Sequence, residues 1–283
     1  MSIVRRVVLG ALLLTAFAAA PAGAQTIDRL KQDKTIRLAV RDDAPPFSFK
    51  DANGKPAGFM VDLCQAVVGR LGDQLHIPDL KIAYVTVTGA DRFDAIIKGK
   101  ADLLCDPTSE TLSRREQVDF SLPTFVDGAS LLVSGDGPTS FEMLAGKKVG
   151  VLAGTTTEQS LRETLKRANI AADVVAIPTH DEGVKQLESG AIAAYFADRA
   201  ILGWLASKAP AGNNLRLATQ YFSLEPYALA LRRGDGDFRL AVDRALSEIY
   251  RSGGIVAIWQ SSFPQIQPSD TLKTLFLISA LPE

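Results

Sequence analysis

The sequence predicts an α/β protein built from two lobes. Short apolar segments of strand length alternate with amphipathic segments of helix length along most of the chain. The alternation occurs once before and once after a Gly- and Pro-rich loop at 134–138. Strands that alternate with helices favour a mostly parallel sheet. Each half of the chain is therefore expected to form one α/β lobe.

The first half begins with a strand at 35–40, followed by a Pro-rich loop at 42–46 and a turn at Asn53-Gly54, a strong hairpin signal. Further strands are expected at 81–87 and 102–105, and helices at 61–71 and 90–98. Gly99 follows the second helix, where a glycine commonly ends one.

The second half repeats the pattern. Strands are expected at 148–152, 174–177, 193–197, 215–218 and 227–232, and helices at 158–168, 181–188, 199–207 and 238–252.

The N-terminus predicts export. Arg5 and Arg6 precede an apolar run at 7–20, which is short for a membrane span, and Ala22-Gly23-Ala24 matches a cleavage site. We expect a signal peptide at 1–24 and a mature chain from Gln25; the alternative is an uncleaved anchor. Without the signal peptide, 29 basic residues face 32 acidic ones. This slightly negative balance argues against a nucleic-acid partner.

Cys64 and Cys105 are the two cysteines of the chain. In an exported protein they either form a disulfide or remain two buried thiols, and the sequence leaves both readings open. No zinc-ligand spacing and no P-loop, G-x-G-x-x-G or G-x-S-x-G motif occurs, so we expect no metal and no cofactor.

The segment 99–125 carries the clearest chemistry. An apolar strand end opens onto the hydroxyls of Thr108 and Ser109, and Arg114 follows a few residues later. An arginine binds a carboxylate through two parallel hydrogen bonds, so this spacing predicts a carboxylate site.

Two further segments follow strands and open helices. Thr155 and Thr156 lie where free backbone N–H groups bind anions, although Thr155 and Glu158 also have the spacing of a capping box. Asp198 ends a strand, where it either caps the next helix or offers a carboxylate to an ammonium group.

Three more polar residues have two readings each. Arg41 lies just past the first strand and Arg92 in the first turn of a helix, where each is either a solvated surface charge or part of a site. His180 is either an exposed loop residue or a ligand contact.

The chain resembles the bacterial extracellular solute-binding proteins of family 3, which serve ABC transporters for polar amino acids. The resemblance lies in PPFSF (45–49), GFMVDL (58–63), GKADLL (99–104), TLSRREQVDFSLP (111–123) and GKKVGVLAGTT (146–156). The glutamate/aspartate-binding branch is the most similar, because it also carries equivalents of Arg41, Arg92 and His180.

The resemblance implies a type II Venus-flytrap fold with two hinge crossings, near 132–134 and 220–223. Lobe 1 would comprise 25–132 and 223–283, and lobe 2 would comprise 133–222. It also implies a periplasmic monomer that binds a free L-amino acid and delivers it to an ABC permease in the inner membrane.

The resemblance further implies roles for the candidate residues. Arg114 would hold the α-carboxylate with Thr108, Ser109 and Thr155, and Thr156 would also belong to the ligand-binding residues. Asp198 would hold the α-ammonium, and Arg41, Arg92 and His180 would surround a side-chain carboxylate. Three arginines against Asp198 give the cleft a charge of +2, which favours glutamate or aspartate over a neutral amino acid.

Three positions depart from the acidic branch. Gly89 replaces a usual Ser, and Asp106-Pro107 replaces Gly-Ser, so another polar amino acid is an alternative ligand. A second alternative is an enzyme similar to cyclohexadienyl dehydratase, but Gln186 stands about where its catalytic carboxylate would align. A sensor domain is a third class.

Overall fold

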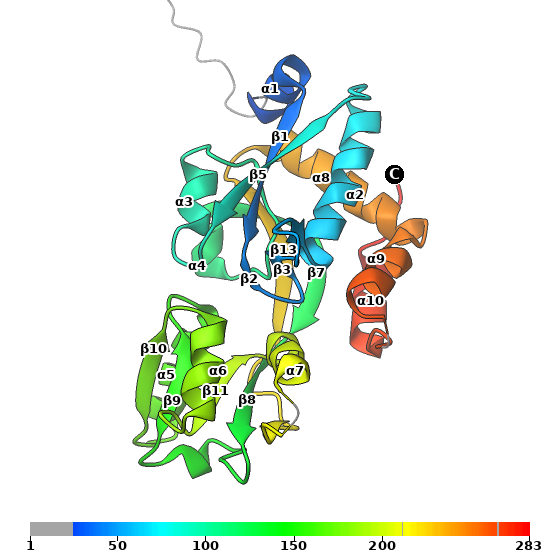
Figure 1. Ribbon diagram of the computed structural model, residues 1–283. Coiled ribbons are helices and arrows are strands. Elements are labelled where there is room, and N and C mark those ends of the chain that lie inside the picture. Colours follow the sequence, from blue (N-terminus) through cyan, green and yellow to red (C-terminus); the bar gives the residue numbers. More distant parts are fainter. Residues whose placement is uncertain (1–24, 211, 265) are drawn as a thin grey trace, which may run out of the picture.

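The computed structural model describes residues 25–210, 212–264 and 266–283, which fold into two α/β lobes, each built around a five-stranded sheet (Figure 1). The signal peptide expected at 1–24 lies outside the described residues. None of the helices in the part of the chain that the structure describes combines the length and apolar character of a membrane span.

The first lobe contains a mixed sheet. Its strands, in spatial order, are β5 (Lys81–Val87), β1 (Thr35–Arg41), β6 (Leu103–Leu104), β13 (Glu225–Arg232) and β7 (Val118–Asp127). β5, β1 and β6 are parallel, whereas β13 and β7 are antiparallel to their neighbours. Four of the five strands therefore run in one direction, as expected for a mostly parallel sheet, and only β13, which returns from the second lobe, runs against them.

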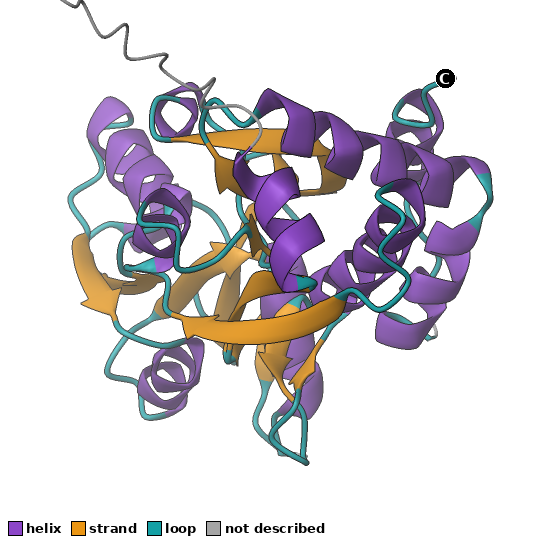
Figure 2. Cartoon of the chain, turned by 90° about the horizontal axis from the view of Figure 1, so that it is seen from above, coloured by secondary structure: helices purple, strands orange, loops and turns teal. Residues whose placement is uncertain are grey.

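Helices lie on either side of this sheet, as the view from above shows (Figure 2). They are α1 (Gln25–Asp33), α2 (Phe59–Gln74), α3 (Arg92–Ile97), α4 (Leu112–Arg115), α8 (Gly236–Arg251), α9 (Gly254–Ser262) and α10 (Asp270–Ile278). A small antiparallel sheet of β2 (Asp43–Ala44), β3 (Ser48–Lys50) and β4 (Pro56–Ala57) continues from the end of β1.

An aromatic cluster fixes the loop after β1 against the crossing strands. The ring centroid of Phe47 lies 4.8 Å from that of Phe125 on β7 and 5.6 Å from that of Tyr227 on β13. Buried edge-to-face pairs of this kind are worth about 0.5–1.5 kcal/mol beyond their buried area. The cluster therefore holds the end of β1, which carries Arg41, at a fixed place beside the crossings.

The second lobe contains the other mixed sheet. Its strands, in spatial order, are β10 (Asp173–Ile177), β9 (Lys148–Leu152), β11 (Ala194–Asp198), β8 (Ala129–Ser134) and β12 (Leu215–Leu217). The helices of this lobe are the short η1 (Glu142–Leu144), α5 (Thr156–Arg167), α6 (His180–Glu188) and α7 (Arg199–Lys208).

The chain crosses between the lobes twice at one narrow place. Asp127 at the end of β7 pairs with Glu225 at the start of β13. Between them Gly128 lies so close to the second crossing that a Cβ would stand 1.9 Å from the carbonyl oxygen of Ser223. Only glycine fits there without a shift of the backbone.

The first crossing lies earlier than the boundary predicted at 132/133. The apolar run at 131–133 reads like the end of a first-lobe strand, but it is the middle of β8, which is antiparallel to β11 in the second sheet. The second crossing, predicted near 220–223, lies between β12 and β13.

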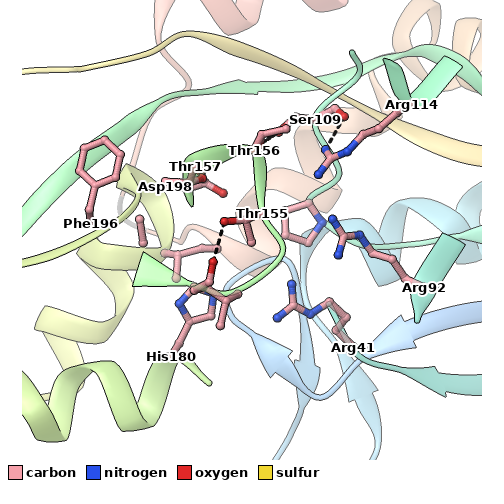
Figure 3. Close-up of a pocket in the computed structure, with 14 residues that line it drawn as sticks. Arg41, Arg92, Ser109, Arg114, Thr155, Thr156, Thr157, His180, Phe196 and Asp198 are labelled. Carbon is pink, nitrogen blue, oxygen red and sulfur yellow. Dashed lines mark hydrogen bonds between the residues drawn. The ribbon is translucent and has the colours of Figure 1, made fainter. Parts of the chain in front are cut away.

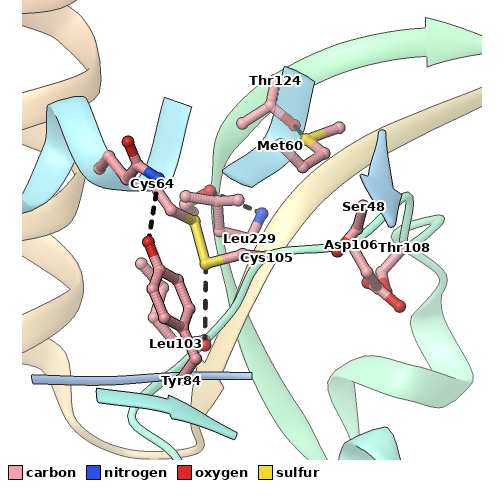
Figure 4. The surroundings of a disulfide bond; sticks show 12 residues. Ser48, Met60, Cys64, Tyr84, Leu103, Cys105, Asp106, Thr108, Thr124 and Leu229 are labelled. Atoms are coloured by element: carbon pink, nitrogen blue, oxygen red, sulfur yellow. Dashed lines mark hydrogen bonds between the residues drawn. A yellow bond between two sulfur atoms is a disulfide. The ribbon is translucent and has the colours of Figure 1, made fainter. Parts of the chain in front are cut away.

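Cys64 of α2 and Cys105, which follows β6, form a disulfide, which the sequence left undecided (Figure 4). Both residues are fully buried. The bond ties the loop that begins at Cys105 to the long helix behind the sheet. Figure 4 shows Asp106 and Thr108 directly beyond this attachment.

We expect the variant Cys64→Ala/Cys105→Ala to lose about 2–4 kcal/mol of unfolding free energy, because the bond closes a loop across 41 residues. Urea unfolding of the variant and of the oxidised wild type would measure the loss. Wild-type protein under reducing conditions is the control and should match the variant. Equal unfolding free energies in all three samples would contradict the expectation.

Candidate functional site

A cavity lies between the two lobes, and both lobes line it. The space between its lining residues, open mouth included, is about 410 Å³. The lining comprises Arg41, Arg92, Pro107, Ser109 and Arg114 from the first lobe, and Leu152, Thr155, Thr156, Thr157, His180, Phe196, Ala197, Asp198 and Ile201 from the second. The three guanidinium groups enter from one side, and His180 and Asp198 lie on the other (Figure 3).

The cavity brings together eight of the nine ligand-binding residues predicted from the sequence. The exception is Thr108, which is fully buried behind the lining and donates its hydroxyl to Asp106. Thr108 therefore supports the loop and is not among the residues that face the cavity.

Arg41 lies at the end of β1 and only 4% of its surface is exposed, so the reading as a solvated surface charge is wrong. Its Nη2 lies 2.8 Å from Oδ1 of Asp43 on β2. The hydroxyl of Ser48 accepts a hydrogen bond from the backbone N–H of Arg41 at 2.9 Å. The neighbouring small sheet thus provides both a counter-charge and a backbone anchor.

Arg92 begins α3 and is equally buried. Its Nη1 donates to the carbonyl of Gly89, and its Nε lies 3.6 Å from Oδ2 of Asp106. Burial lowers the pKa of Arg92, Asp106 raises it, and the nearby cation Arg41 lowers it further. The side chain remains a cation at neutral pH.

Gly89 lies against both cations. A Cβ at this position would be 3.5 Å from Nη1 of Arg92 and 3.8 Å from the guanidinium carbon of Arg41, which is ordinary contact. The position therefore has room for the serine that the glutamate/aspartate-binding branch usually carries. In this chain that hydroxyl is missing beside the guanidiniums of Arg41 and Arg92.

Arg114 lies on the short helix α4, which Thr111 caps by accepting from the Arg114 backbone N–H. Its Nη1 donates to the carbonyl of Ser109 at 2.7 Å, and its guanidinium lies over the ring of Phe93 at 5.2 Å. Burial and the neighbouring Arg92 lower its pKa to about 10, so it stays charged at neutral pH.

The first turn of α5 provides three hydroxyls. Thr155 caps the helix by accepting from the Glu158 backbone N–H at 3.1 Å, so the capping interpretation holds although the residue also lines the cavity. Thr156 Oγ1 lies 3.2 Å from Oγ of Ser109 in the other lobe and donates to Glu225 at 2.8 Å. Thr156 thus joins the lobes at the rim of the cavity.

Asp198 ends β11 and occupies the N-cap position of α7, but its side chain accepts no capping hydrogen bond there. Asp127 fills that role from the first crossing, because its Oδ2 accepts from the Ala200 backbone N–H at 3.0 Å. Asp198 accepts instead from the hydroxyl of Thr157 at 3.1 Å. Burial and the nearby Glu225 raise the pKa of Asp198 to about 6.

Asp198 and Arg114 thus differ from the other charges of the site. Within the described residues neither forms an ion pair. A carboxylate and a guanidinium that both face one cavity without an ion-pair partner are suited to a ligand with an ammonium and a carboxylate.

His180 begins α6 and is 3% exposed, so the reading as an exposed loop residue is wrong. Its Nδ1 lies 2.8 Å from the hydroxyl of Tyr195. If Tyr195 donates, the ring proton is assigned to Nε2, which makes that nitrogen a neutral donor. Burial, with Arg41 nearby, lowers the pKa of His180 to about 3.

The sequence reasoning missed several residues at the site. Thr157 directly follows Thr155 and Thr156 in the sequence, and its contact with Asp198 joins residues 41 positions apart. Glu225 and Asp127 lie at the crossings between the lobes. The only sequence signal for them was the predicted position of the two hinge crossings. No group of three or more His, Cys, Asp or Glu residues that could hold a metal ion occurs among the described residues.

A family model described as bacterial extracellular solute-binding proteins, family 3, matches residues 36–265. The L-glutamate/L-aspartate-binding protein of Pseudomonas aeruginosa is 32% identical over 90% of this chain and 85% of its own length. The glutamate/glutamine/aspartate/asparagine-binding protein BztA of Rhodobacter capsulatus is 30% identical over 81% of this chain and 68% of its own.

Among solved structures, the ancestral amino acid-binding protein AncCDT-1, a precursor of cyclohexadienyl dehydratase, superposes with a TM-score of 0.73. It is 28% identical and the match covers 84% of this chain and 99% of that one. The two-lobed type II fold expected from the sequence is thereby confirmed.

We expect His180 to make the protein less stable in acid. The unfolded chain takes up a proton on this histidine near pH 6.5, whereas the folded pKa is about 3. Stability is therefore lost as the pH falls below 6.5, by about 2–3 kcal/mol at pH 4.5. Urea unfolding at pH 7.0 and 4.5 should show a smaller loss in His180→Gln than in wild type.

The matched control is His76→Gln, which changes the other histidine of the chain at an exposed position. It should follow the wild type at both pH values. The expectation fails if His180→Gln and His76→Gln lose equal amounts of stability on acidification.

Proposed function

Because the chain belongs to family 3 of the bacterial extracellular solute-binding proteins, we propose that it is a periplasmic receptor that binds a free L-amino acid and delivers it to an ABC permease. Glutamate and aspartate are the proposed ligands, as the name of the relative from Pseudomonas aeruginosa suggests. The receptor acts as a monomer without a cofactor.

One observation supports this proposal above all others. Arg114 of one lobe and Asp198 of the other line the same cavity without an ion-pair partner among the described residues. In the proposed complex Arg114 binds the α-carboxylate, with Ser109, Thr155 and Thr156 beside it. Asp198 binds the α-ammonium. Burial disfavours the charges of Arg114 and Asp198, and the opposite charges of the ligand compensate both.

The side chain of the ligand then lies towards Arg41, Arg92 and His180. All three line the cavity, and each can donate a hydrogen bond to a carboxylate oxygen. Binding draws the lobes together, as in other proteins that close by a hinge. Contacts between the lobes that support such closure are Thr156 with Ser109 and the rings of Phe49 and Trp204, 5.9 Å apart.

A receptor is favoured over an enzyme. Gln186 stands about where the catalytic carboxylate of cyclohexadienyl dehydratase would align. Its amide donates to Glu182 at 2.9 Å, and both residues lie on α6. It is not among the residues that line the cavity. Elimination needs a general acid held next to the substrate, and an amide does not supply a proton at neutral pH.

We expect L-glutamate and L-aspartate to stabilise the purified mature protein. A ligand at a hundredfold excess over its dissociation constant adds about 2.7 kcal/mol to the unfolding free energy. A thermal-shift panel of the common amino acids measures this effect, with D-glutamate as the control for stereochemistry. Stabilisation by neutral or basic amino acids alone would overturn the acidic assignment, and turnover of prephenate or arogenate would overturn the receptor.

We expect Arg114→Ala to abolish binding of every amino acid, because it removes the proposed partner of the α-carboxylate. Arg41→Ala should weaken acidic ligands more than neutral ones, because it changes only the side-chain end. Arg115→Ala is the matched control, since Arg115 is 54% exposed and pairs with Glu110. Isothermal titration measures all three, and unchanged affinity in Arg114→Ala would refute the assigned roles.

A further inference from the structure

The end of the cavity that would hold the ligand's side chain, near Arg41, Arg92 and His180, has a different net charge from the one that the sequence suggested. The count of +2 for the cleft included three arginines and Asp198 but no other carboxylate. The structure adds Asp43, 2.8 Å from Arg41, and Asp106, 3.6 Å from Arg92. Arg41 and Arg92 therefore each have a carboxylate of the protein itself beside them.

The two pairs differ in how well water screens them. The side chain of Asp43 is 32% exposed, whereas the side chains of Asp106 and Arg92 are 1% and 4% exposed. Charges in the interior interact more strongly than charges at the surface, because the surrounding dielectric is lower. Asp106 is therefore the stronger of the two counter-charges.

Asp106 acts on the cavity from behind. It is not part of the lining, and its Oδ1 accepts the hydroxyl of Thr108 while Oδ2 faces Arg92. Neither Oδ2 of Asp106 nor Nε of Arg92 has a hydrogen-bond partner, and both atoms are buried. The two unsatisfied atoms face one another, so each depends on the charge of the other.

The proposed ligand contacts leave this end electrically balanced. The α-carboxylate and α-ammonium neutralise Arg114 and Asp198. What remains around the side chain is two guanidiniums, two carboxylates and a neutral His180, with a sum of zero. The hydrogen-bond donors at this end can bind an oxygen acceptor. Because the net charge there is zero, the acceptor does not have to be an anion.

We propose that Asp106 is a specificity-determining residue that acts through Arg92, so that the site accepts the side-chain amides glutamine and asparagine alongside glutamate and aspartate. This inference rests on the proposed function. A carboxylate and a primary amide have nearly the same shape and each offers an oxygen acceptor, and they differ in charge and in the NH2 donor that replaces the second carboxylate oxygen.

The test compares L-glutamate with L-glutamine by isothermal titration on the mature protein. We expect the two dissociation constants of the wild type to lie within about tenfold, which corresponds to about 1.4 kcal/mol. Rejection of glutamine by more than a hundredfold would overturn the inference. This measurement needs no variant and so does not depend on how a substitution folds.

Asp106→Asn keeps the shape and removes the counter-charge. We expect it to raise the preference for glutamate over glutamine at least tenfold, mainly through tighter glutamate binding. Asp94→Asn is the matched control, because Asp94 on α3 forms an exposed pair with Lys98, which follows that helix, and the ratio should stay unchanged. A structural role alone would weaken both ligands equally, so an unchanged ratio in Asp106→Asn overturns the inference.

The two levels of the proposal fail differently. If the wild type binds no amino acid, the proposed function fails and the inference fails with it. If the wild type binds glutamate and excludes glutamine, the receptor stands and only the role of Asp106 is refuted.

Discussion

The site depends on one constraint: the chain crosses between its two sheets twice, at a single narrow place. Gly128 allows the crossings to touch, since any larger residue would meet the carbonyl of Ser223. The backbone N–H of Ala129 donates to the hydroxyl of Ser223 at 2.9 Å, which joins the two crossings again. Because the cavity takes its cations from one lobe and Asp198 from the other, these contacts fix how the two halves of the site meet.

The crossings also connect directly to the rim of the cavity. Glu225 opens β13 and accepts the hydroxyl of Thr156, which also lies against Ser109 in the first lobe. Asp127 closes β7 and caps α7, the helix that starts directly after Asp198. Two acidic residues of the crossings therefore hold the starts of two helices of the second lobe, and both helices carry cavity residues.

The second requirement is electrostatic. Three guanidiniums in one small cavity disfavour one another, and burial adds to this by lowering the pKa of Arg92 and Arg114. An uncompensated buried charge costs several kcal/mol. In the first lobe Asp43 and Asp106 offset this cost, because Asp43 lies beside Arg41 and Asp106 lies beside Arg92 in space.

The sequence predicted the regular elements well where local signals frame them. The strands at 81–87 and 148–152 have the predicted bounds, because each is a short β-rich run between polar turns. β7 was missed, since Pro123 lies within it and argues against a central strand. The structure accommodates this proline because β7 is the edge strand of its sheet and its register with β13 shifts nearby.

The sequence predicted which residues come together at the candidate site, but it did not predict the net charge of the site. Strand ends and helix starts mark Arg41, Arg114 and Asp198 by position along the chain. The counter-charge of Arg41 lies only two positions away at Asp43, whereas two other partners are hidden by sequence distance. Asp106 lies 14 positions after Arg92, and the cap of α7 comes from a residue 73 positions away.

The loop after β6 combines these effects in five residues. Cys105 ties it to α2, Asp106 faces Arg92, and Pro107 and Ser109 line the cavity. The interaction of a counter-ion with its neighbour weakens as the distance between them grows, and the disulfide next to Asp106 limits how far this residue can move. Because Asp106 sits behind the lining, it changes the potential in the cavity without occupying any of its volume. The lining residues set the shape of the cavity beside Arg92, and Asp106 behind them offsets part of their charge.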